Sequence, residues 1–326
     1  MIDTGTYKNP LVLFENGIGD YFISLPAIRA LNHLFENGIT LFTGSLNAQS
    51  VKNEGLKGVE ILQMEMAASG RTYNLADLRQ IMTRHDLYIN LNPWYCRDKQ
   101  QAYLRFLSEK NFTSVGFFSF YDHHIRFANN KNAFDIAFDI PLAFDPSLEI
   151  ERFAYPPVFD DTASALTRKI RALFPEECLL LGIQDETKQE KMLPARQFEQ
   201  IIDRLLEQYP YLAVLILGCS TSIRWQSLRH ADRVLFLEQQ APLVISCALV
   251  QAVDCFLGID SVFLHVADLM RKPAVGLFGP SSETEWGLRF TNGQVIRAQS
   301  GKMEDIHTGD IIQAMSNIIE RQMIPG

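Results

Sequence analysis

The first residues that could do chemistry lie in a glycine-containing turn, Glu15-Asn-Gly-Ile-Gly-Asp20, which follows an apolar run. A glycine pair after a strand lets the backbone approach a phosphate, as in dinucleotide-binding folds. Phe22 stands where the third glycine of that pattern belongs, and Thr43-Gly-Ser45 stands about 20 residues on, where an acidic residue is expected. The turn therefore does not predict a dehydrogenase, and Asp20 taken alone is typical of a helix N-cap.

Two lysines stand in a second polar segment, Gln184–Phe198, between a predicted strand and a predicted helix that has Pro194 near its start. Lys188 and Lys191 are within reach of a ligand at the edge of a sheet. A lysine there can pair with a diphosphate as a mobile point charge. The alternative is that both are solvated loop lysines.

A third segment, Leu257-Gly-Ile-Asp-Ser-Val-Phe-Leu-His265, contains a strand that ends at Gly258 and a helix predicted from about Ser261. Asp260 or Ser261 would cap this helix and leave further amides for phosphate oxygens. His265 lies four residues after Ser261, on the same helix face. Taken alone, such a histidine is more typical of packing than of ligand binding.

A fourth segment leaves its strand through Gly279-Pro280, a tight exit. Three hydroxyls follow beside backbone amides: Ser281, Ser282 and Thr284.

The elements that position these segments alternate between short apolar strands and helices. Strands are predicted at Leu11–Phe14, Ile39–Thr43, Val59–Leu62, Leu87–Leu91, Thr113–Phe117, Leu179–Ile183, Ala213–Leu217, Val253–Leu257 and Ala274–Phe278. Helices are predicted at Thr162–Leu173, Gln197–Gln208 and Asp305–Arg321. Another helix is predicted after Gly19, and Pro26 would kink or restart it. One face of this helix would be lined by Phe22, Leu25, Ile28, Leu31 and Leu34. The alternation predicts parallel sheets covered on both faces, with ligands at the carboxyl ends of the strands.

A proline-rich stretch around Phe144–Asp161 divides the pattern. Helical periodicity lapses there, as expected for a linker between domains. We therefore predict an α/β protein with two doubly wound halves, residues 1–155 and 156–326.

Composition excludes several classes of protein. The 326 residues carry a formal net charge of −8, which argues against a nucleic-acid partner. No apolar run is long enough to span a bilayer, and the polar N-terminus lacks a secretory signal. The five cysteines have no C-x-x-C spacing, which predicts free thiols in a reducing cytoplasm and no metal site.

In order and spacing, the four segments resemble glycosyltransferase family 9, which contains the lipopolysaccharide heptosyltransferases and has the GT-B fold. Gly19-Asp20 followed by Leu25-Pro-Ala-Ile-Arg-Ala-Leu31 is similar to the family's first signature, and Lys191-Met-Leu-Pro194 to its K-x-W-P segment. Gly258-Ile-Asp-Ser261 with His265-Val-Ala267 is similar to its G-x-D-[ST]-x-x-x-H-x-A signature, and Leu277-Phe-Gly-Pro-Ser281 to its F-G-P-T segment.

The resemblance implies two Rossmann-like domains facing across a cleft, with the acceptor bound by residues 1–155 and the donor by residues 156–326. The C-terminal helix would pack back on the first domain. Asp20 would be the general base and Lys191 would steady the diphosphate. The other implied donor-binding residues are Lys188, Gly218, Asp260, Ser261, His265, Gly279, Pro280 and Ser281. Acceptor contacts are assigned to Gly19 and to Trp94, whose ring could stack on a sugar.

The implied activity is a metal-independent, inverting transfer of a sugar, heptose being one candidate, to lipopolysaccharide or another surface glycan. The nucleotide diphosphate sugar, an ADP-linked one among the candidates, is substrate, and no cofactor is expected. The expected location is the cytoplasm, with peripheral contact at the inner face of the membrane. Val262 and Phe263 stand where the family has glycine after the D-[ST] pair. Two alternatives stay open: a nucleotide-sugar-binding protein impaired in transfer, and a GT-B-like nucleotide-sugar epimerase.

Overall fold

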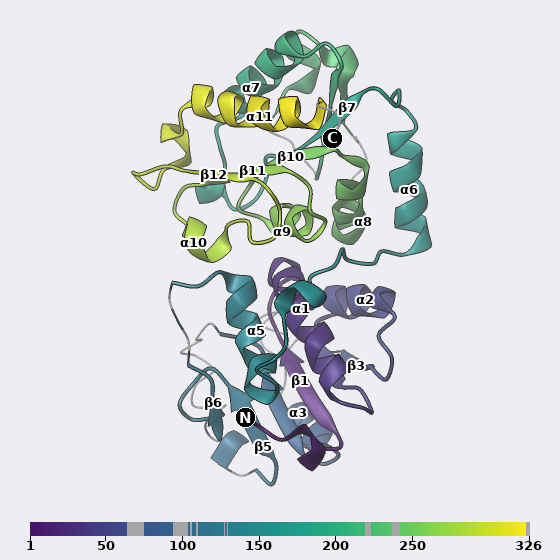
Figure 1. Cartoon of the computed structure of the whole chain (residues 1–326), viewed down its shortest axis with the longest axis vertical. Coiled ribbons are helices and arrows are strands. Elements are labelled where there is room, and N and C mark those ends of the chain that lie inside the picture. Colours follow the sequence, from purple (N-terminus) through teal and green to yellow (C-terminus); the bar gives the residue numbers. More distant parts are fainter. Residues whose placement is uncertain are drawn as a thin grey trace. The chain divides into compact units, whose positions relative to one another are not determined.

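The computed structural model describes residues 1–63, 75–93, 104, 106–108, 110–126, 128, 130–218, 223–236 and 242–323. The chain divides into two compact units, Met1–Tyr155 and Pro156–Gly326, each built on its own six-stranded parallel sheet (Figure 1). No helix in the described ranges is long and apolar enough to cross a membrane.

The first unit has the strand order β3-β2-β1-β4-β5-β6. Its strands are β1 (Pro10–Phe14), β2 (Thr40–Thr43), β3 (Glu60–Gln63), β4 (Leu87–Asn90), β5 (Thr113–Gly116) and β6 (His123–His124). Its helices are α1 (Ile18–Leu34), α2 (Ser45–Glu54), α3 (Leu75–Met82) and α5 (Ala133–Phe144), with 3-10 turns η1 (Thr4–Thr6) and η2 (Ile150–Arg152).

The second unit has the strand order β12-β11-β10-β7-β8-β9. Its strands are β7 (Leu179–Gln184), β8 (Leu212–Ile216), β9 (Val234–Phe236), β10 (Cys255–Ile259), β11 (Ala274–Phe278) and β12 (Gln294–Arg297). Its helices are α6 (Asp161–Arg171), α7 (Ala195–Gln208), α8 (Leu243–Ala248), α9 (Val262–Leu269), α10 (Glu283–Trp286) and α11 (Thr308–Met323). Its 3-10 turns are η3 (Gln189–Lys191), η4 (Trp225–Ser227), η5 (Ala231–Arg233), η6 (Leu249–Ala252) and η7 (Met303–Asp305).

Counted from its own first strand, each unit has the order 3-2-1-4-5-6 of a dinucleotide-binding fold. The predicted doubly wound α/β architecture is therefore confirmed. The chain direction across the sheet reverses between β1 and β4 in the first unit, and between β7 and β10 in the second. Ligands of such sheets bind at the carboxyl ends of these two strands, because the loops that follow them diverge and leave a crevice.

From Tyr21 to Leu31, helix α1 is buried on all sides and not only along the face that the sequence predicted. Every residue from Tyr21 to Leu31 is buried, because α5 packs along α1 and α2 also contacts it (Figure 1). Pro26 lies inside one continuous helix. A proline costs the helix one backbone hydrogen bond, which packing against the neighbouring elements can offset.

A buried cation on α1 fixes the end of the first unit. Arg29 donates to Glu54 Oε2 from Nε (2.9 Å) and from Nη2 (2.6 Å). It also donates to the carbonyl oxygens of Phe153 (2.9 Å) and Tyr155 (2.6 Å), and its guanidinium carbon lies 3.5 Å from the centre of the Tyr155 ring. The last residues before the linker are thus held to α1 and to the end of α2.

The core of the second unit lies on both sides of its sheet. Helix α11 packs against α7 and against β10, β11 and β12, and its apolar side chains complete one hydrophobic cluster with those of α7. On α9, buried Asp268 accepts the backbone N–H groups of Arg289 (2.7 Å), Phe290 (2.8 Å) and Thr291 (2.7 Å), which fixes the loop before β12.

Candidate active site

The carboxyl ends of β7 and β10 bring together two of the four segments singled out in the sequence. Gln184 ends β7 and is buried; its Oε1 accepts a hydrogen bond of 2.6 Å from the Ser261 hydroxyl. Ser261 is the N-cap residue of α9, but its side chain makes no capping hydrogen bond to the helix. The first amides of α9 are therefore not covered by a side chain of the cap residue, as a phosphate-binding helix start requires.

An ion pair joins the same two segments. The Lys191 Nζ lies 2.5 Å from Asp260 Oδ2. The Asp260 side chain is 5% exposed and the Lys191 side chain 27%, so the lysine can still reach a ligand from the solvent side. Since an ammonium group has three N–H donors, a lysine that binds one carboxylate can also bind a diphosphate oxygen. Lys188, by contrast, is exposed at the start of η3.

His265 is buried beside this ion pair, with its Nε2 3.9 Å from Asp260 Oδ1. Burial lowers the pKa of His265 to about 4; the Asp260 carboxylate opposes this effect and the Lys191 ammonium adds to it. The imidazole is therefore neutral at neutral pH and packs near the Trp286 ring, at a centre-to-centre distance of 6.4 Å. Its position suits a group that supports the Asp260 loop.

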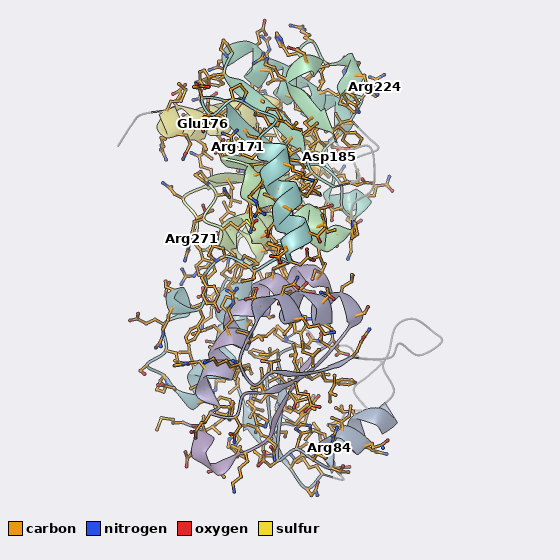
Figure 2. The ribbon with its side chains drawn as sticks, turned by 90° about the vertical axis from the view of Figure 1, so that its right-hand side faces the viewer. Arg84, Arg171, Glu176, Asp185, Arg224 and Arg271 are labelled. Carbon is orange, nitrogen blue, oxygen red and sulfur yellow. The ribbon has the colours of Figure 1, made fainter. Side chains whose placement is uncertain are left out.

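Carboxyl groups also follow β7 directly. Asp185 is fully buried in the second unit, whereas the side chain of Arg224 lies at its surface (Figure 2). The pKa of the next carboxyl, Glu186, is raised, first by burial and then by the Asp185 charge. The sequence analysis did not single out these two residues, although acidic side chains directly after a buried strand could have indicated that they belong to the site.

Gly218 lies next to the Phe263 ring. Gly218 has a φ of +91°, which side-chain-bearing residues rarely adopt, and a Cβ placed there would lie 3.9 Å from the Phe263 ring. Phe263 itself is only 4% exposed. The bulky residue that replaces the family's glycine is thus directed into the protein beside Gly218, while Val262 remains half-buried.

At the end of β11 the structure gives Gly279 a packing role. A Cβ at this position would lie 2.8 Å from Met303 Sδ and 3.1 Å from the carbonyl oxygen of Gly301. Pro280 is exposed, and the Ser281 Oγ is buried without a hydrogen-bond partner in the described part of the chain. Ser282 accepts from the Glu285 amide and caps α10.

In the first unit, Asp20 is the third residue of α1, and Gly17 is the N-cap. The interpretation of Asp20 as a cap is therefore wrong, because the helix begins two residues earlier than Asp20. Asp20 and Gly19 are half-buried. A carboxylate in the first turn still gains from the helix dipole. Trp94 lies outside the described residues.

A network of carboxamides surrounds the ends of β1, β2 and β4 and was missed in the sequence. Asn16 Nδ2 donates to Asn92 Oδ1 (3.3 Å), and Asn92 Nδ2 donates to Glu15 Oε1 (3.3 Å). Asn47 Nδ2 donates to the Asn16 carbonyl (2.9 Å) and to Thr43 Oγ1 (3.2 Å). Such groups are suited to hydroxyl-rich ligands. The available signal was an asparagine after each of β1 and β4.

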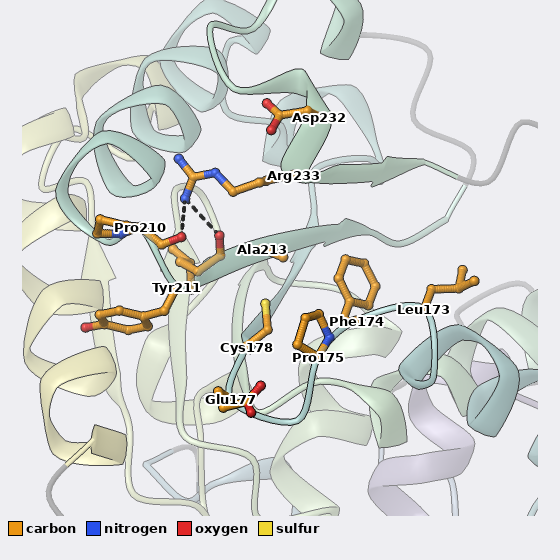
Figure 3. Close-up of a pocket in the computed structure, with 11 residues that line it drawn as sticks. Leu173, Phe174, Pro175, Glu177, Cys178, Pro210, Tyr211, Ala213, Asp232 and Arg233 are labelled. Carbon is orange, nitrogen blue, oxygen red and sulfur yellow. Dashed lines mark hydrogen bonds between the residues drawn. The ribbon is translucent and has the colours of Figure 1, made fainter.

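A cavity of about 470 Å³ lies at the opposite edge of the second sheet, at the amino ends of β7 and β8 (Figure 3). Apolar side chains line much of it, and Arg233 donates to the carbonyl oxygens of Pro210 (3.2 Å) and Leu212 (3.1 Å). Because it faces away from the carboxyl ends of the strands, it is not the candidate active site. Within the described ranges, no three histidine, cysteine, aspartate or glutamate side chains are grouped to hold a metal ion.

Comparison with known proteins gives one family and a set of similar structures. Residues 163–315 match glycosyltransferase family 9 (heptosyltransferase). No curated protein sequence matches the chain. A family 9 glycosyl transferase from Veillonella parvula DSM 2008 is 16% identical, with a TM-score of 0.76 over 97% of this chain and 98% of that one.

Two E. coli structures are also similar. The ADP-heptose lps heptosyltransferase II is 15% identical, with a TM-score of 0.68 over 96% of this chain and 99% of that one. The heptosyltransferase WaaC, solved with ADP, is 13% identical, with a TM-score of 0.65 over 95% and 99%. At these identities the likeness establishes the fold, and it confirms the GT-B architecture expected from the sequence.

Proposed function

Because residues 163–315 match glycosyltransferase family 9 (heptosyltransferase), we propose that the chain transfers a sugar with inversion from a nucleotide diphosphate donor. The family resemblance seen in the sequence is thereby confirmed. The proposed acceptor is a hydroxyl of lipopolysaccharide or of another surface glycan or glycolipid. The proposed location is the cytoplasm, with peripheral contact at the inner face of the membrane.

The observation that carries the donor assignment is the joining of Lys191, Asp260 and Ser261 at the carboxyl ends of β7 and β10. This is the place where a doubly wound sheet binds nucleotides. The E. coli heptosyltransferase WaaC of the same fold was solved with ADP, which supports a nucleoside diphosphate here and makes ADP-heptose a candidate donor. We assign the donor to residues 156–326 and the acceptor to residues 1–155.

In the proposed reaction, Asp20 accepts the proton of the acceptor hydroxyl as the hydroxyl oxygen attacks the anomeric carbon of the donor sugar. The bond from that carbon to the diphosphate oxygen breaks, and the diphosphate leaves with the electron pair. The Lys191 ammonium and the amide groups at the start of α9 stabilise the charge that builds up on the diphosphate. These groups would supply the role that a metal ion has in other transferases, so the proposed transfer needs no metal.

The test of this function starts with a thermal-shift screen of the full chain against ADP, UDP, GDP and their sugars, because ligand binding raises the melting temperature. Transfer from the best donor to an envelope extract is then measured for the unaltered chain and for two variants. Asp20→Asn should lower turnover by about 100-fold or more, the range of general-base catalysis, with nucleotide affinity unchanged.

Asp135→Asn is a matched control, since Asp135 is the half-buried third residue of α5, as Asp20 is of α1. It should leave turnover within about twofold of the unaltered chain. Full activity of Asp20→Asn would exclude Asp20 as the base, and loss of activity in both variants would indicate damage to the fold.

The alternative of a nucleotide-sugar-binding protein impaired in transfer depends on Val262 and Phe263. Since Phe263 is directed into the protein beside Gly218, its bulk gives little support to that alternative. Val262→Gly tests what remains: the variant should bind the donor and turn it over as the unaltered chain does. Donor binding without turnover in the unaltered chain, with turnover gained in Val262→Gly, would favour the impaired protein.

A further inference from the structure

The orientation of the buried Gln184 carboxamide can be assigned from its neighbours. Its Nε2 donates to the carbonyl oxygen of Glu186, and its Oε1 lies 2.6 Å from Ser261 Oγ. A backbone carbonyl can only accept, so the amide nitrogen has to face Glu186. The two ends of an amide otherwise look alike, and the hydrogen-bond network decides between them. The oxygen of Gln184 therefore faces Ser261.

This orientation fixes the role of the Ser261 hydroxyl. A hydroxyl has one hydrogen to donate and two lone pairs to accept with. Ser261 donates its hydrogen to Gln184, which also explains why the serine does not cap α9 through its side chain. Only acceptor capacity is left for a ligand. The ionised oxygens of a diphosphate are acceptors as well, so they gain nothing from Ser261.

The charges beside Ser261 favour the same type of ligand group. Asp260 precedes it, and Asp185 and Glu186 follow Gln184, so carboxyl groups flank both partners of the hydrogen bond. The Lys191 ammonium is 2.5 Å from Asp260, which offsets one of these charges. At the Ser261 hydroxyl itself, a neutral group that donates a hydrogen bond is therefore better placed than a phosphate oxygen, for which Lys191 and the amides at the start of α9 remain available.

We propose that Ser261 accepts a hydrogen bond from a hydroxyl group of the donor, on the ribose or on the transferred sugar, and that Gln184 is the positioning residue that commits Ser261 to this role. The inference rests on the proposed function, because it assumes a nucleotide sugar at the carboxyl ends of β7 and β10. It differs from a general donor-binding role in that it assigns Ser261 to a hydroxyl and excludes it from the diphosphate.

Calorimetry on the full chain tests the inference with ADP, 2′-deoxy-ADP, 3′-deoxy-ADP and ADP-heptose. If the thermal-shift screen selects another nucleotide, the corresponding series replaces this one. Ser261→Ala should weaken binding by about 3- to 10-fold, the value of one hydrogen bond. For a ribose contact, the loss is seen with ADP and disappears with one of the deoxy forms. For a sugar contact, the loss is seen only with ADP-heptose.

Two further variants separate the role of Gln184 from damage to the fold. Ser261→Thr keeps a hydroxyl and should retain the affinity of the unaltered chain. Gln184→Met removes the acceptor, so the Ser261 hydrogen is no longer held, and the discrimination between hydroxyl and deoxy ligands should fall by about 3- to 10-fold. Melting temperatures of all variants are compared, and only those within a few degrees of the unaltered chain are compared in affinity.

Two results would overturn the inference alone. One is a loss in Ser261→Ala that is equal for ADP, both deoxy forms and ADP-heptose, because it would assign the hydroxyl to the diphosphate. The other is unchanged affinity for all four ligands. Failure of the unaltered chain to bind any nucleotide or nucleotide sugar is a different result, since it overturns the proposed function as well.

Discussion

The buried ion pair on α1 allows a perturbation whose size can be worked out from the structure. Replacing Arg29 by methionine keeps most of the side-chain volume and removes the guanidinium. It leaves the Glu54 carboxylate, whose side chain is 1% exposed, without its cation. It also removes the donors to the carbonyl oxygens of Phe153 and Tyr155 and the stacking on the Tyr155 ring.

Breaking a buried pair from one side costs about 3–5 kcal/mol, because the remaining charge stays buried after its oppositely charged partner is removed. For a unit of this size, each kcal/mol corresponds to about 2–4 °C in melting temperature, so Arg29→Met should melt roughly 6–20 °C lower. Glu54→Gln leaves the buried Arg29 guanidinium without its anion but keeps a hydrogen-bond acceptor, so we expect a loss of about 3 kcal/mol, at the lower end of the same range. The double variant should lose much less than the sum of the two, with a coupling energy of at least about 2 kcal/mol.

The assay is urea unfolding of the full chain, followed by fluorescence and circular dichroism and fitted with one or two transitions. Arg171→Met is the control: Arg171, labelled in Figure 2, is half-buried, and its nearest Asp254 oxygen lies 4.0 Å away. Its guanidinium also donates to backbone carbonyl oxygens, with Cys178 the nearest at 3.1 Å. Arg171→Met should cost about 1–2 kcal/mol, because the ion pair is weak and the hydrogen bonds are partly exposed. Additive losses in the Arg29 and Glu54 double variant would refute the reasoning, because they would mean that the two side chains do not compensate each other.

Three further outcomes are expected. His265 has a pKa of about 4 in the folded protein, against an ordinary value of 6.5. As the pH falls, the unfolded chain therefore binds a proton at His265 before the folded protein does. The free energy of unfolding should fall as the pH is lowered from about 6.5 to 4, by at most about 3 kcal/mol. Denaturation at several pH values should show this slope in the unaltered chain and a shallower one in His265→Gln; equal slopes would contradict the assignment. Lys191→Met should lower kcat/KM by roughly 10- to 100-fold, which is the effect of one hydrogen bond to a charged group. The control Lys188→Met, at an exposed position, should change kcat/KM less than about threefold. Equal effects of the two variants would contradict a special role for Lys191. Prolonged dialysis against EDTA should leave transfer unchanged, and activity lost on chelation and restored by one added divalent cation would refute metal independence.

The fold could be predicted where a buried element gives a recognisable pattern of apolar residues in the local sequence. Strand β11, Ala274–Phe278, has the bounds predicted for it, because a fully buried parallel strand is a continuous apolar run. Edge strands β9 and β12 were missed, since they are short and partly exposed. Helix α5, Ala133–Phe144, was also missed. Its apolar residues cover more than one face, so the helical period is weak in the sequence.

The candidate site could be predicted as a set of residues but not as a set of contacts. The hydrogen bond between Gln184 and Ser261 joins positions 77 apart in sequence, and the ion pair between Lys191 and Asp260 joins positions 69 apart. Both depend on the pairing of β7 with β10, which the order of strands in the sheet determines. No local pattern encodes that order. Gln184 and Asn47 were overlooked for the same reason.

All strands of each sheet come from one continuous segment of the chain, and this has a consequence for protein engineering. Every strand of the first sheet lies before Tyr155, and every strand of the second lies after Pro156, as does the α11 helix that packs on it. A single crossover between Tyr155 and Pro156 therefore leaves every strand pairing of the two described sheets intact and keeps the Arg29 anchor on the same side of the junction as its carbonyl partners. Chimaeras that exchange whole halves between relatives can be built at this one peptide bond.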